Sequence, residues 1–292
     1  MKASKKSVYE IVTDRICELL EKGNIPWRKP WTGTHGGFPR SMESGKLYRG
    51  INHFLLSCAD FESPYWLTFN QARNRGGQVR KGEKGTPIIF FQWKEYEKTS
   101  SNGETVKEQK PILRYYVVMN IEQIDGIEAP KGEEIKDFGF DPIAEAETII
   151  HNMPNRPHIT HNEQRAYYQP ALDMVNMPKA TSFEQAEGYY SVLFHELAHS
   201  TGHESRLARE RFSGMAAFGD ETYSREELVA EFGAAFLCGH ARIEPATIEN
   251  SAAYIQGWIK RIKSDPRLIV TAAAQGQKAA DYILGQHGTD GE

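Results

Sequence analysis

The stretch His195-Glu196-Leu197-Ala198-His199 decides how the second half of this 292-residue chain is interpreted. Side chains four positions apart on an α-helix lie one turn apart on the same face, so both imidazoles can bind one metal ion. The spacing therefore predicts that His195 and His199 are metal ligands. Glu196 lies beside them and is predicted to be the general base of a hydrolytic site, which takes a proton from metal-bound water.

The flanking sequence predicts a well-delimited helix around this motif. Ser182-Phe183-Glu184-Gln185 has the pattern of a capping box at a helix start, and Gly202 supplies a stop after the second histidine. Apolar residues at helical spacing would form its buried side, namely Tyr189, Tyr190, Val192, Leu193 and Leu197. The competing interpretation is a chance match of two surface histidines, which a third ligand nearby would weaken.

A third ligand is expected because zinc in a hydrolytic site takes three protein ligands and keeps one position for water. The downstream stretch 226–231 (EELVAE) supplies carboxylates at the start of a second predicted helix, whose small residues let it pass close to the first. Glu227 and Glu231 share a helix face, whereas Glu226 points about 100° away. We assign Glu227 as the third ligand, on analogy more than on spacing, and Glu231 as an outer group that orients a ligand histidine.

Two alternatives concern the third ligand. Residues 224–227 (SREE) also fit a capping box in which Glu227 merely closes the helix start, and Glu231 would then be the ligand. A three-histidine site is rejected because its longer motif requires a histidine where this chain has Ser205. Zn²⁺ is the default ion for two imidazoles and one carboxylate, with Mn²⁺ or another divalent ion as the alternative.

Composition excludes several classes of protein. With 39% hydrophobic and 25% charged side chains, the chain is neither disordered nor collagen-like. Its three cysteines lie far apart without CxxC spacing, which argues against a disulfide scaffold. No apolar run approaches the roughly 18 to 20 residues that cross a bilayer, and the N-terminus lacks the apolar core of a signal peptide. We expect a soluble cytoplasmic protein with no membrane partner.

A stretch rich in Gly, Pro and acidic residues divides the chain and predicts two domains, 1–128 and 143–292, joined by a linker over 129–142. The predicted class is α+β, with an N-terminal α+β module and a C-terminal, mainly helical module that has a small sheet. The expected elements are helices over 8–20 and 143–153, paired strands over 87–93 and 113–119 joined by a long polar loop, and short strands over 166–168 and 173–177.

Charge and aromatic residues are unevenly distributed between the halves. Residues 1–128 carry 20 basic and 15 acidic side chains, whereas the remainder carries 15 and 24. Four of the five tryptophans lie among the basic residues of the first 93 positions. Cations that neutralise phosphates beside rings that stack on bases suit single-stranded nucleic acid. The alternative places the tryptophans in the core and the basic residues on a solvated surface.

Six motifs resemble those of the ArdC-type antirestriction proteins of conjugative plasmids and mobile elements, and together they span nearly the whole chain. They are residues 26–31 (PWRKPW), 48–52 (YRGIN), 66–72 (WLTFNQA), 79–85 (VRKGEKG), 195–203 (HELAHSTGH) and 226–231 (EELVAE). The resemblance implies an N-terminal domain that binds single-stranded DNA and a zincin-like C-terminal domain. The candidate DNA contacts are Trp27, Arg28, Lys29, Trp31, Tyr48, Arg49, Asn52, Arg80, Lys81 and Lys84.

These observations lead to one leading hypothesis and one alternative. The leading hypothesis is a metal-dependent, gluzincin-like peptidase joined to a single-stranded DNA binder, which protects incoming plasmid DNA from host restriction. Its substrate would be a protein or peptide, with a host restriction component as a candidate. The alternative is a non-enzymatic protein that coats DNA or occludes a restriction enzyme and has a structural metal site. Glu196 favours the enzyme, because a structural site needs no base.

Overall fold

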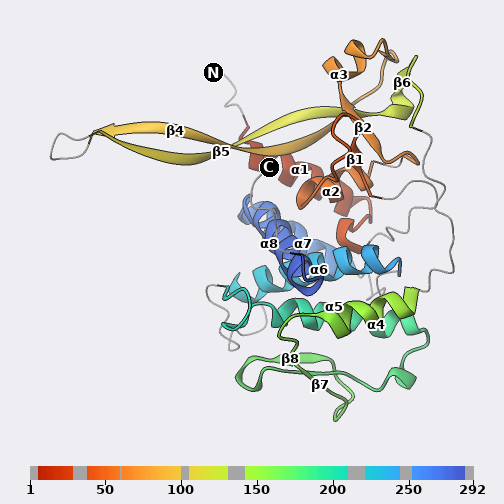
Figure 1. The fold of residues 1–292 in the computed structure, drawn as a ribbon, viewed down its shortest axis with the longest axis vertical. Helices are drawn as coiled ribbons and strands as arrows, with labels where there is room; N and C mark the ends of the chain where they lie inside the picture. The colour runs from red at the N-terminus through yellow and green to blue at the C-terminus, as the bar shows by residue number, and fades with distance from the viewer. Residues whose placement is uncertain are drawn as a thin grey trace.

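The computed structural model describes residues 6–28, 38–59, 61–99, 105–130, 142–209, 221–243 and 252–286. Figure 1 shows a block of helices in the middle of the molecule, with a sheet and a long hairpin on one side and a small sheet on the other. The chain is α+β, as predicted. No helix within these ranges is long and apolar enough to cross a membrane.

The first helix, α1 (Val8–Glu21), matches the helix predicted over 8–20. Its start is fixed by a capping box: the Ser7 hydroxyl accepts a hydrogen bond from the Glu10 N–H at 3.2 Å, and the Glu10 carboxylate accepts one from the Ser7 N–H at 2.6 Å. Gly23, at φ +79°, follows its end. The chain then continues into the short 3₁₀ helix η1 (Pro26–Arg28).

The main sheet of the N-terminal half has the order β1-β2-β5-β4. Its strands are β1 (Arg40–Ser41), β2 (Tyr65–Thr68), β4 (Thr86–Thr99) and β5 (Thr105–Asn120). β4 and β5 pair from Thr86 opposite Val118 out to Thr99 opposite Thr105. The predicted strands are therefore confirmed, but the predicted long polar loop is wrong, because backbone pairing continues through it. Residues 94–112 show no alternation of apolar and polar side chains, so periodicity did not predict their pairing.

Smaller elements complete this half of the chain. They are α2 (Ile51–Ser57), α3 (Phe69–Asn74), β3 (Gln78–Val79), η2 (Ile121–Gln123) and β6 (Ile124–Asp125). β3 and β6 form an antiparallel pair. A reciprocal capping box between Thr68 and Gln71 begins α3 directly after β2.

The second half begins with the predicted helix and the two predicted short strands, and it adds a third strand, β7, that was not predicted. The elements are α4 (Pro142–Asn152), β7 (His158–Thr160), β8 (Tyr167–Gln169), η3 (Pro170–Leu172), β9 (Met174–Asn176) and η4 (Ala180–Ser182). The strand order is β7-β9-β8, with β9 parallel to β7 and antiparallel to β8. β8 therefore lies at an edge of this sheet.

Four helices follow: α5 (Ala186–Ser200), α6 (Glu221–Ala241), α7 (Ala252–Ser264) and α8 (Leu268–Ile283). The capping box predicted at Ser182 is wrong. Ser182 ends η4, and α5 begins at Ala186 after Gln185, which forms no side-chain cap. The ring of Phe183 packs edge-on against Tyr189, with centroids 5.5 Å apart, while its backbone is extended. The backbone at Phe183 is therefore not helical, and α5 starts three residues later, at Ala186.

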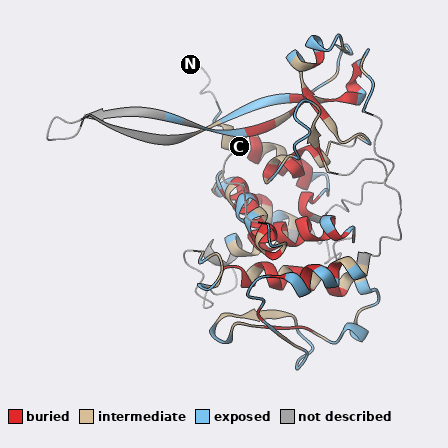
Figure 2. Cartoon of the chain, viewed as in Figure 1, coloured by how far each residue is buried: buried red, intermediate tan, exposed pale blue. Residues whose placement is uncertain are grey.

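The largest hydrophobic core runs through both halves of the chain (Figure 2). Trp27 is 1% exposed, and its ring centroid lies 5.2 Å from that of Phe232 and 6.2 Å from that of Trp258. α1 packs against α7 and α2 packs against α8. The two predicted domains therefore share one core, while residues 131–141 of the predicted linker lie outside the described residues. The boundaries of the two domains stay a prediction.

Polar contacts also join the halves at α8. Arg49 forms an ion pair with Asp281, and the Gly50 N–H donates to the Gln277 side chain at 3.2 Å. Gly50 is at φ +55°, a conformation that favours glycine, and it leads directly into α2. The motif at residues 48–52 thus attaches the N-terminal half to the last helix.

Candidate metal centre

Helix α5 places both histidines of the motif on one face, as their spacing predicted. The Nε2 atoms of His195 and His199 lie 3.1 Å apart. Both side chains are mostly buried, and their rings meet edge-on with centroids 4.7 Å apart. Two imidazole nitrogens this close to each other can direct their lone pairs at one cation.

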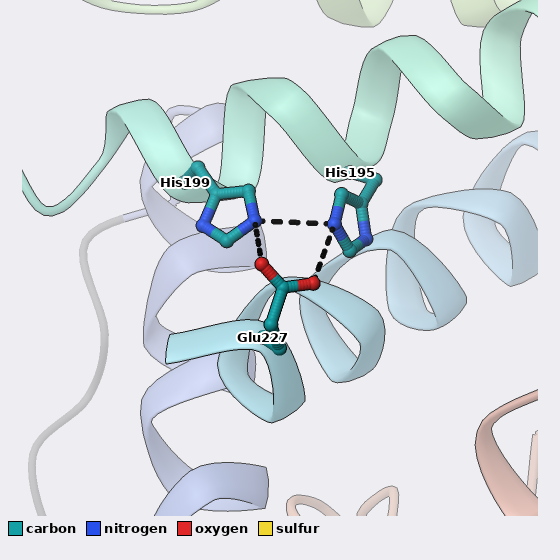
Figure 3. A group of neighbouring side chains, drawn as sticks. All are labelled: His195, His199 and Glu227. Carbon is teal, nitrogen blue, oxygen red and sulfur yellow. Dashed lines mark hydrogen bonds and ion pairs between the residues drawn. The ribbon is translucent and has the colours of Figure 1, made fainter. Parts of the chain in front are cut away.

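Helix α6 supplies the third donor, Glu227 (Figure 3). Its Oε2 lies 3.5 Å from His195 Nε2, and its Oε1 lies 3.4 Å from His199 Nε2. The described part of α6 already begins at Glu221, so Glu227 lies inside the helix. The alternative in which Glu227 merely closes a helix start is therefore wrong.

The close approach of α5 and α6 depends on small residues. A Cβ atom added to Gly233 of α6 would lie 2.8 Å from the Cβ of Ala198 in α5, closer than real Cβ contacts. The prediction that small residues let the second helix pass close to the first is confirmed. This crossing brings the carboxylate of Glu227 to the two imidazoles.

The three donor atoms fit a divalent cation. Metal–ligand distances of about 2.0 to 2.1 Å in tetrahedral geometry separate the ligand atoms by about 3.3 Å. The three separations here are 3.1, 3.4 and 3.5 Å. Two imidazoles and one carboxylate also match the ligand set of hydrolytic zinc sites and leave room for a further ligand.

The electrostatics of the site favour a cation. Burial lowers the pKa of His195, but its hydrogen bond with Glu227 and the nearby charges of Glu196 and Glu231 outweigh that effect and raise the pKa to about 9. Burial also raises the pKa of Glu227, but the two histidines outweigh it and hold that pKa far below its usual range. Three carboxylates thus surround two imidazoles, so the site attracts positive charge.

The two other predicted carboxylates occupy different places. Glu196 is 8% exposed, and among the described residues no hydrogen bond or ion pair holds its carboxylate. Glu231 is half-buried and acts on His195 through its charge. It is not a member of the three-donor cluster that the described residues form.

A buried arginine that sequence reasoning missed links the two metal-site helices. Arg209 donates to the carbonyl oxygens of Ala198 and His199, at 3.1 and 3.3 Å, at the end of α5. It also forms an ion pair with Glu226, the neighbour of Glu227 on α6, with Nε 3.1 Å from Oε1. A cation after a helix C-terminus is a recognisable signal, but its pairing with Glu226 was not readable from sequence.

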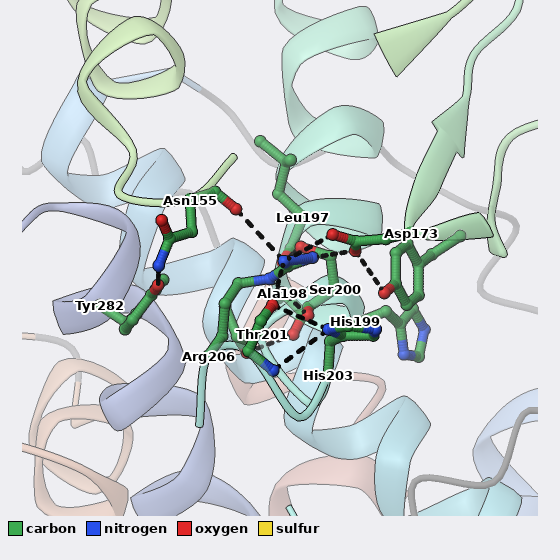
Figure 4. A network of polar contacts seen from close by, with 12 residues as sticks. Asn155, Asp173, Leu197, Ala198, His199, Ser200, Thr201, His203, Arg206 and Tyr282 are labelled. Carbon is green, nitrogen blue, oxygen red and sulfur yellow. Dashed lines mark hydrogen bonds and ion pairs between the residues drawn. The ribbon is translucent and has the colours of Figure 1, made fainter. Parts of the chain in front are cut away.

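A second arginine, Arg206, joins the end of α5 to the small sheet (Figure 4). Its side chain is fully buried; Nε donates to the Ser200 carbonyl at 2.9 Å and Nη1 donates to Asp173 at 3.0 Å. Asp173 also accepts a hydrogen bond from the Tyr168 hydroxyl at 2.7 Å. Since Tyr168 belongs to β8, this network holds the edge strand against the helix that carries the histidines.

Of the predicted DNA contacts over residues 27–31, the structure describes the side chain of Trp27 alone. Trp27 is enclosed in the shared core, so no face of its ring is open to a base and it cannot stack on DNA. The burial matches the alternative interpretation of a core tryptophan. Lys29, Trp31 and the side chain of Arg28 lie outside the described residues.

The remaining predicted DNA contacts that the structure describes differ in exposure and in pairing. Asn52 pairs with the backbone of Ile89 in β4, donating to its carbonyl and accepting from its N–H, both at 2.8 Å. Tyr48 is half-buried. Arg49 forms an ion pair with Asp281. Arg80 forms ion pairs with Glu83 and Asp125. The side chains of Lys81 and Lys84 are exposed.

Comparisons with known proteins match both halves. A family model described as the N-terminal domain of anti-restriction factor ArdC matches residues 6–119, and one described as a zincin-like metallopeptidase matches residues 144–275. DNA primase TraC of Escherichia coli is 38% identical over 299 residues, which cover 96% of this chain but 27% of TraC. The protein y4eC of Sinorhizobium fredii is 32% identical over 291 residues, which cover 96% of this chain and 92% of y4eC.

Two solved structures of the antirestriction protein ArdC from plasmid R388 share this fold. The metal-free structure has a TM-score of 0.74 and 39% identity, and the match covers 95% of this chain and 97% of that one. The Mn(II)-bound structure has a TM-score of 0.73 and 37% identity, and the match covers 96% and 98%.

The fold and the three-donor cluster together define a class. A helix with two imidazoles, a carboxylate from the next helix and a small sheet against the first helix form a zincin-like metallopeptidase domain. The N-terminal half adds a domain found in anti-restriction factors. The chain belongs to the ArdC family of antirestriction proteins.

Proposed function

We propose that this chain protects incoming DNA from host restriction by binding it as a single strand and by cleaving a protein with its metal centre. Membership of the ArdC family supports the antirestriction role. The peptidase role rests on one observation above all: the carboxylate of Glu196 is buried, acts on the donor His195 through its charge, and forms no hydrogen bond or ion pair with any described residue. A structural metal site needs no proton acceptor, so it would not require a buried carboxylate beside its ligands.

His195, His199 and Glu227 would hold the divalent ion, with Zn²⁺ as the default and Mn²⁺ as the alternative that the relative's Mn(II)-bound structure supports. When bound, such an ion polarises a peptide carbonyl and makes water more acidic. Glu196 would accept the proton of the attacking water and deliver it to the leaving nitrogen. Glu231 would stabilise His195 through its charge.

The edge strand β8 would hold the peptide. Edge strands offer free backbone groups that bind an extended segment by main-chain pairing. β8 lies at the edge of the small sheet and packs against α5, and the Arg206 network fixes it there. Main-chain pairing would align a substrate with the metal centre without strong demands on its sequence.

A single substitution, Glu196→Gln, tests the peptidase role. It removes the proton acceptor and leaves the three metal donors in place, so bound metal and DNA affinity should be unchanged. Cleavage of a general protein substrate and of proteins from a restricting host should fall by about 10² to 10⁴, the usual contribution of a general base. Glu187→Gln, in the first turn of the same helix, is the matched control and should change none of these quantities.

Protection of transferred DNA in a restricting host then separates the two hypotheses. Loss of protection with Glu196→Gln would support proteolysis as the antirestriction mechanism. Full protection with a folded, metal-loaded Glu196→Gln protein would favour the non-enzymatic alternative, in which the chain coats DNA or occludes the restriction enzyme.

A further inference from the structure

The β4–β5 hairpin is exposed near the point where it leaves the protein body (Figure 2), and a group of large apolar residues lies in this exposed part. Two neighbouring residues of β4 and three of β5 are each between 44% and 49% exposed, namely Phe90, Phe91, Tyr115, Tyr116 and Val117. Large aromatic side chains normally contribute to a core, and an exposed group of them marks a binding surface.

The strand register assigns these residues to two faces. Ile88 lies opposite Tyr116 and Phe90 lies opposite Arg114. Opposed residues project to the same side of an antiparallel pair, and every second residue along a strand shares that side. Phe90, Arg114 and Tyr116 therefore share one face, which we call the arm face, and the rings of Phe90 and Tyr116 meet edge-on with centroids 5.9 Å apart.

The arm face is supported by a rigid base. Ile88 and Val118, on the same side as Phe90 and Tyr116, are buried against Trp66 and Leu56. The Asn52 side chain holds the backbone of the intervening Ile89 in both directions at 2.8 Å. The rings thus project from a fixed strand pair, so little conformational freedom is lost when a ligand binds to them.

The two strand segments that form the arm face carry only positive charge. Residues 86–94 and 112–118 contain Lys94 and Arg114 but no aspartate or glutamate. The side chain of Arg114 is exposed and forms no hydrogen bond or ion pair with another described residue, in contrast to those of Arg49 and Arg80. An available guanidinium beside exposed rings matches a ligand that offers both phosphates and flat bases.

We propose that the arm face binds single-stranded DNA, with Phe90 and Tyr116 stacking on bases and Arg114 contacting a phosphate. This assignment rests on the proposed DNA-binding function. It places the DNA-binding site on residues that lie outside the motifs at 26–31, 48–52 and 79–85. Stacking tolerates any base, so the arm face would bind DNA with little sequence preference.

The test is the affinity of the full-length, metal-loaded protein for fluorescein-labelled oligo(dT) and for a mixed-sequence single strand, measured by fluorescence anisotropy at several salt concentrations. Phe90→Ser and Tyr116→Ser should each weaken binding about 5- to 150-fold at every salt concentration, the range for one stacked base. Arg114→Gln should reduce the slope of log affinity against log salt by about 0.7, the value for one phosphate on a single strand.

The matched controls lie on α3, which carries the exposed ring of Phe69 and the exposed Arg73. Phe69→Ser and Arg73→Gln should leave affinity and salt slope unchanged. Circular dichroism and bound metal serve as folding controls for every variant. Affinity within twofold of wild type for folded Phe90→Ser and Tyr116→Ser would overturn the proposal.

Two further outcomes would also overturn it, and they differ from each other. If the wild-type chain binds no single-stranded DNA, the proposed DNA-binding function fails together with the arm face. If the variants bind DNA normally but sediment as monomers where the wild type sediments as a dimer, the arm face is a contact with a second copy and the DNA site lies elsewhere.

Discussion

The ion pair between Arg209 and Glu226 should keep the carboxylate of the neighbouring Glu227, the third metal donor, close to the two histidines. We consider Arg209→Met, Glu226→Gln and the double variant. Arg209→Met removes the donor to the last carbonyls of α5 and leaves the Glu226 carboxylate without its partner, one residue from Glu227. The pair can thus be treated as a link between α5 and α6 whose removal affects both stability and metal affinity.

Burial sets the magnitude. The side chains of Arg209 and Glu226 are 7% and 21% exposed. Breaking a fully buried pair by removing one partner costs about 3 to 5 kcal/mol. Because Glu226 retains some contact with water, we expect about 2 to 3 kcal/mol for Arg209→Met, and a coupling energy of about 1 to 3 kcal/mol in the double-mutant cycle. Metal affinity should fall about 10- to 100-fold, as for groups that orient a ligand.

Urea unfolding gives the stability of each variant, and competition with a chromogenic chelator gives its zinc affinity. The matched control is the pair of Arg225 with Asp265, which lies beside Glu226 on α6 but is exposed and separated by 3.6 Å. That pair should contribute about 0 to 1 kcal/mol and leave metal affinity unchanged. Equal coupling energies in the two cycles, together with wild-type zinc affinity for Arg209→Met, would show that the Arg209–Glu226 ion pair does not position Glu227.

Three further predictions follow from the site and the core. Glu227→Gln should lose bound metal on dialysis, whereas Glu231→Gln should keep it with affinity about 10- to 100-fold lower; the reverse result in metal analysis would exchange their roles. Burial lowers the pKa of His53 to about 3, so the unfolded chain takes up its proton below about pH 6.5 and the folded chain only near pH 3. Between those values His53 should reduce the free energy of unfolding by about 1.4 kcal/mol per pH unit as pH falls, and urea unfolding of His53→Leu should show a shallower pH slope. Gly276→Ala should destabilise the chain by about 1 to 3 kcal/mol, because its Cβ would lie 2.5 Å from that of Phe232, whereas Gly257→Ala meets nothing within 4 Å and should be neutral or stabilising in thermal unfolding.

The metal centre was the most predictable part of the molecule, because its signals are local. The i, i+4 spacing fixes where His195 and His199 lie on any helix, and the same periodicity separates Glu227 from Glu226 on the next one. The role of Arg209 was not predicted, because it depends on an ion pair between a residue that follows α5 and Glu226 on α6. Sequence spacing carries no information about such a contact.

The N-terminal half was less predictable because burial and pairing there depend on distant residues. The periodicity of residues 8–20 predicted a buried helix face, but not that it packs on helices of the other half. From the sequence alone, Trp27 and Arg49 were predicted to be available for DNA. In the structure Trp27 packs against Phe232 and Arg49 forms an ion pair with Asp281, and both partners lie far away in the sequence. The exposed rings of Phe90 and Tyr116 lie in a segment that reads as an ordinary core strand.

The shared core has a thermodynamic consequence for the whole chain. A ligand that binds only the folded state adds its binding free energy to every segment that unfolds together with its site, about 2.7 kcal/mol at a free concentration 100 times its Kd. The metal donors all come from the C-terminal half, but Trp27, α1 and α2 belong to the same core as α6. Metal bound between α5 and α6 should therefore raise the melting temperature of the N-terminal half, and a chelator should destabilise the base of the β4–β5 hairpin, where Ile89 belongs to the shared core, without binding there.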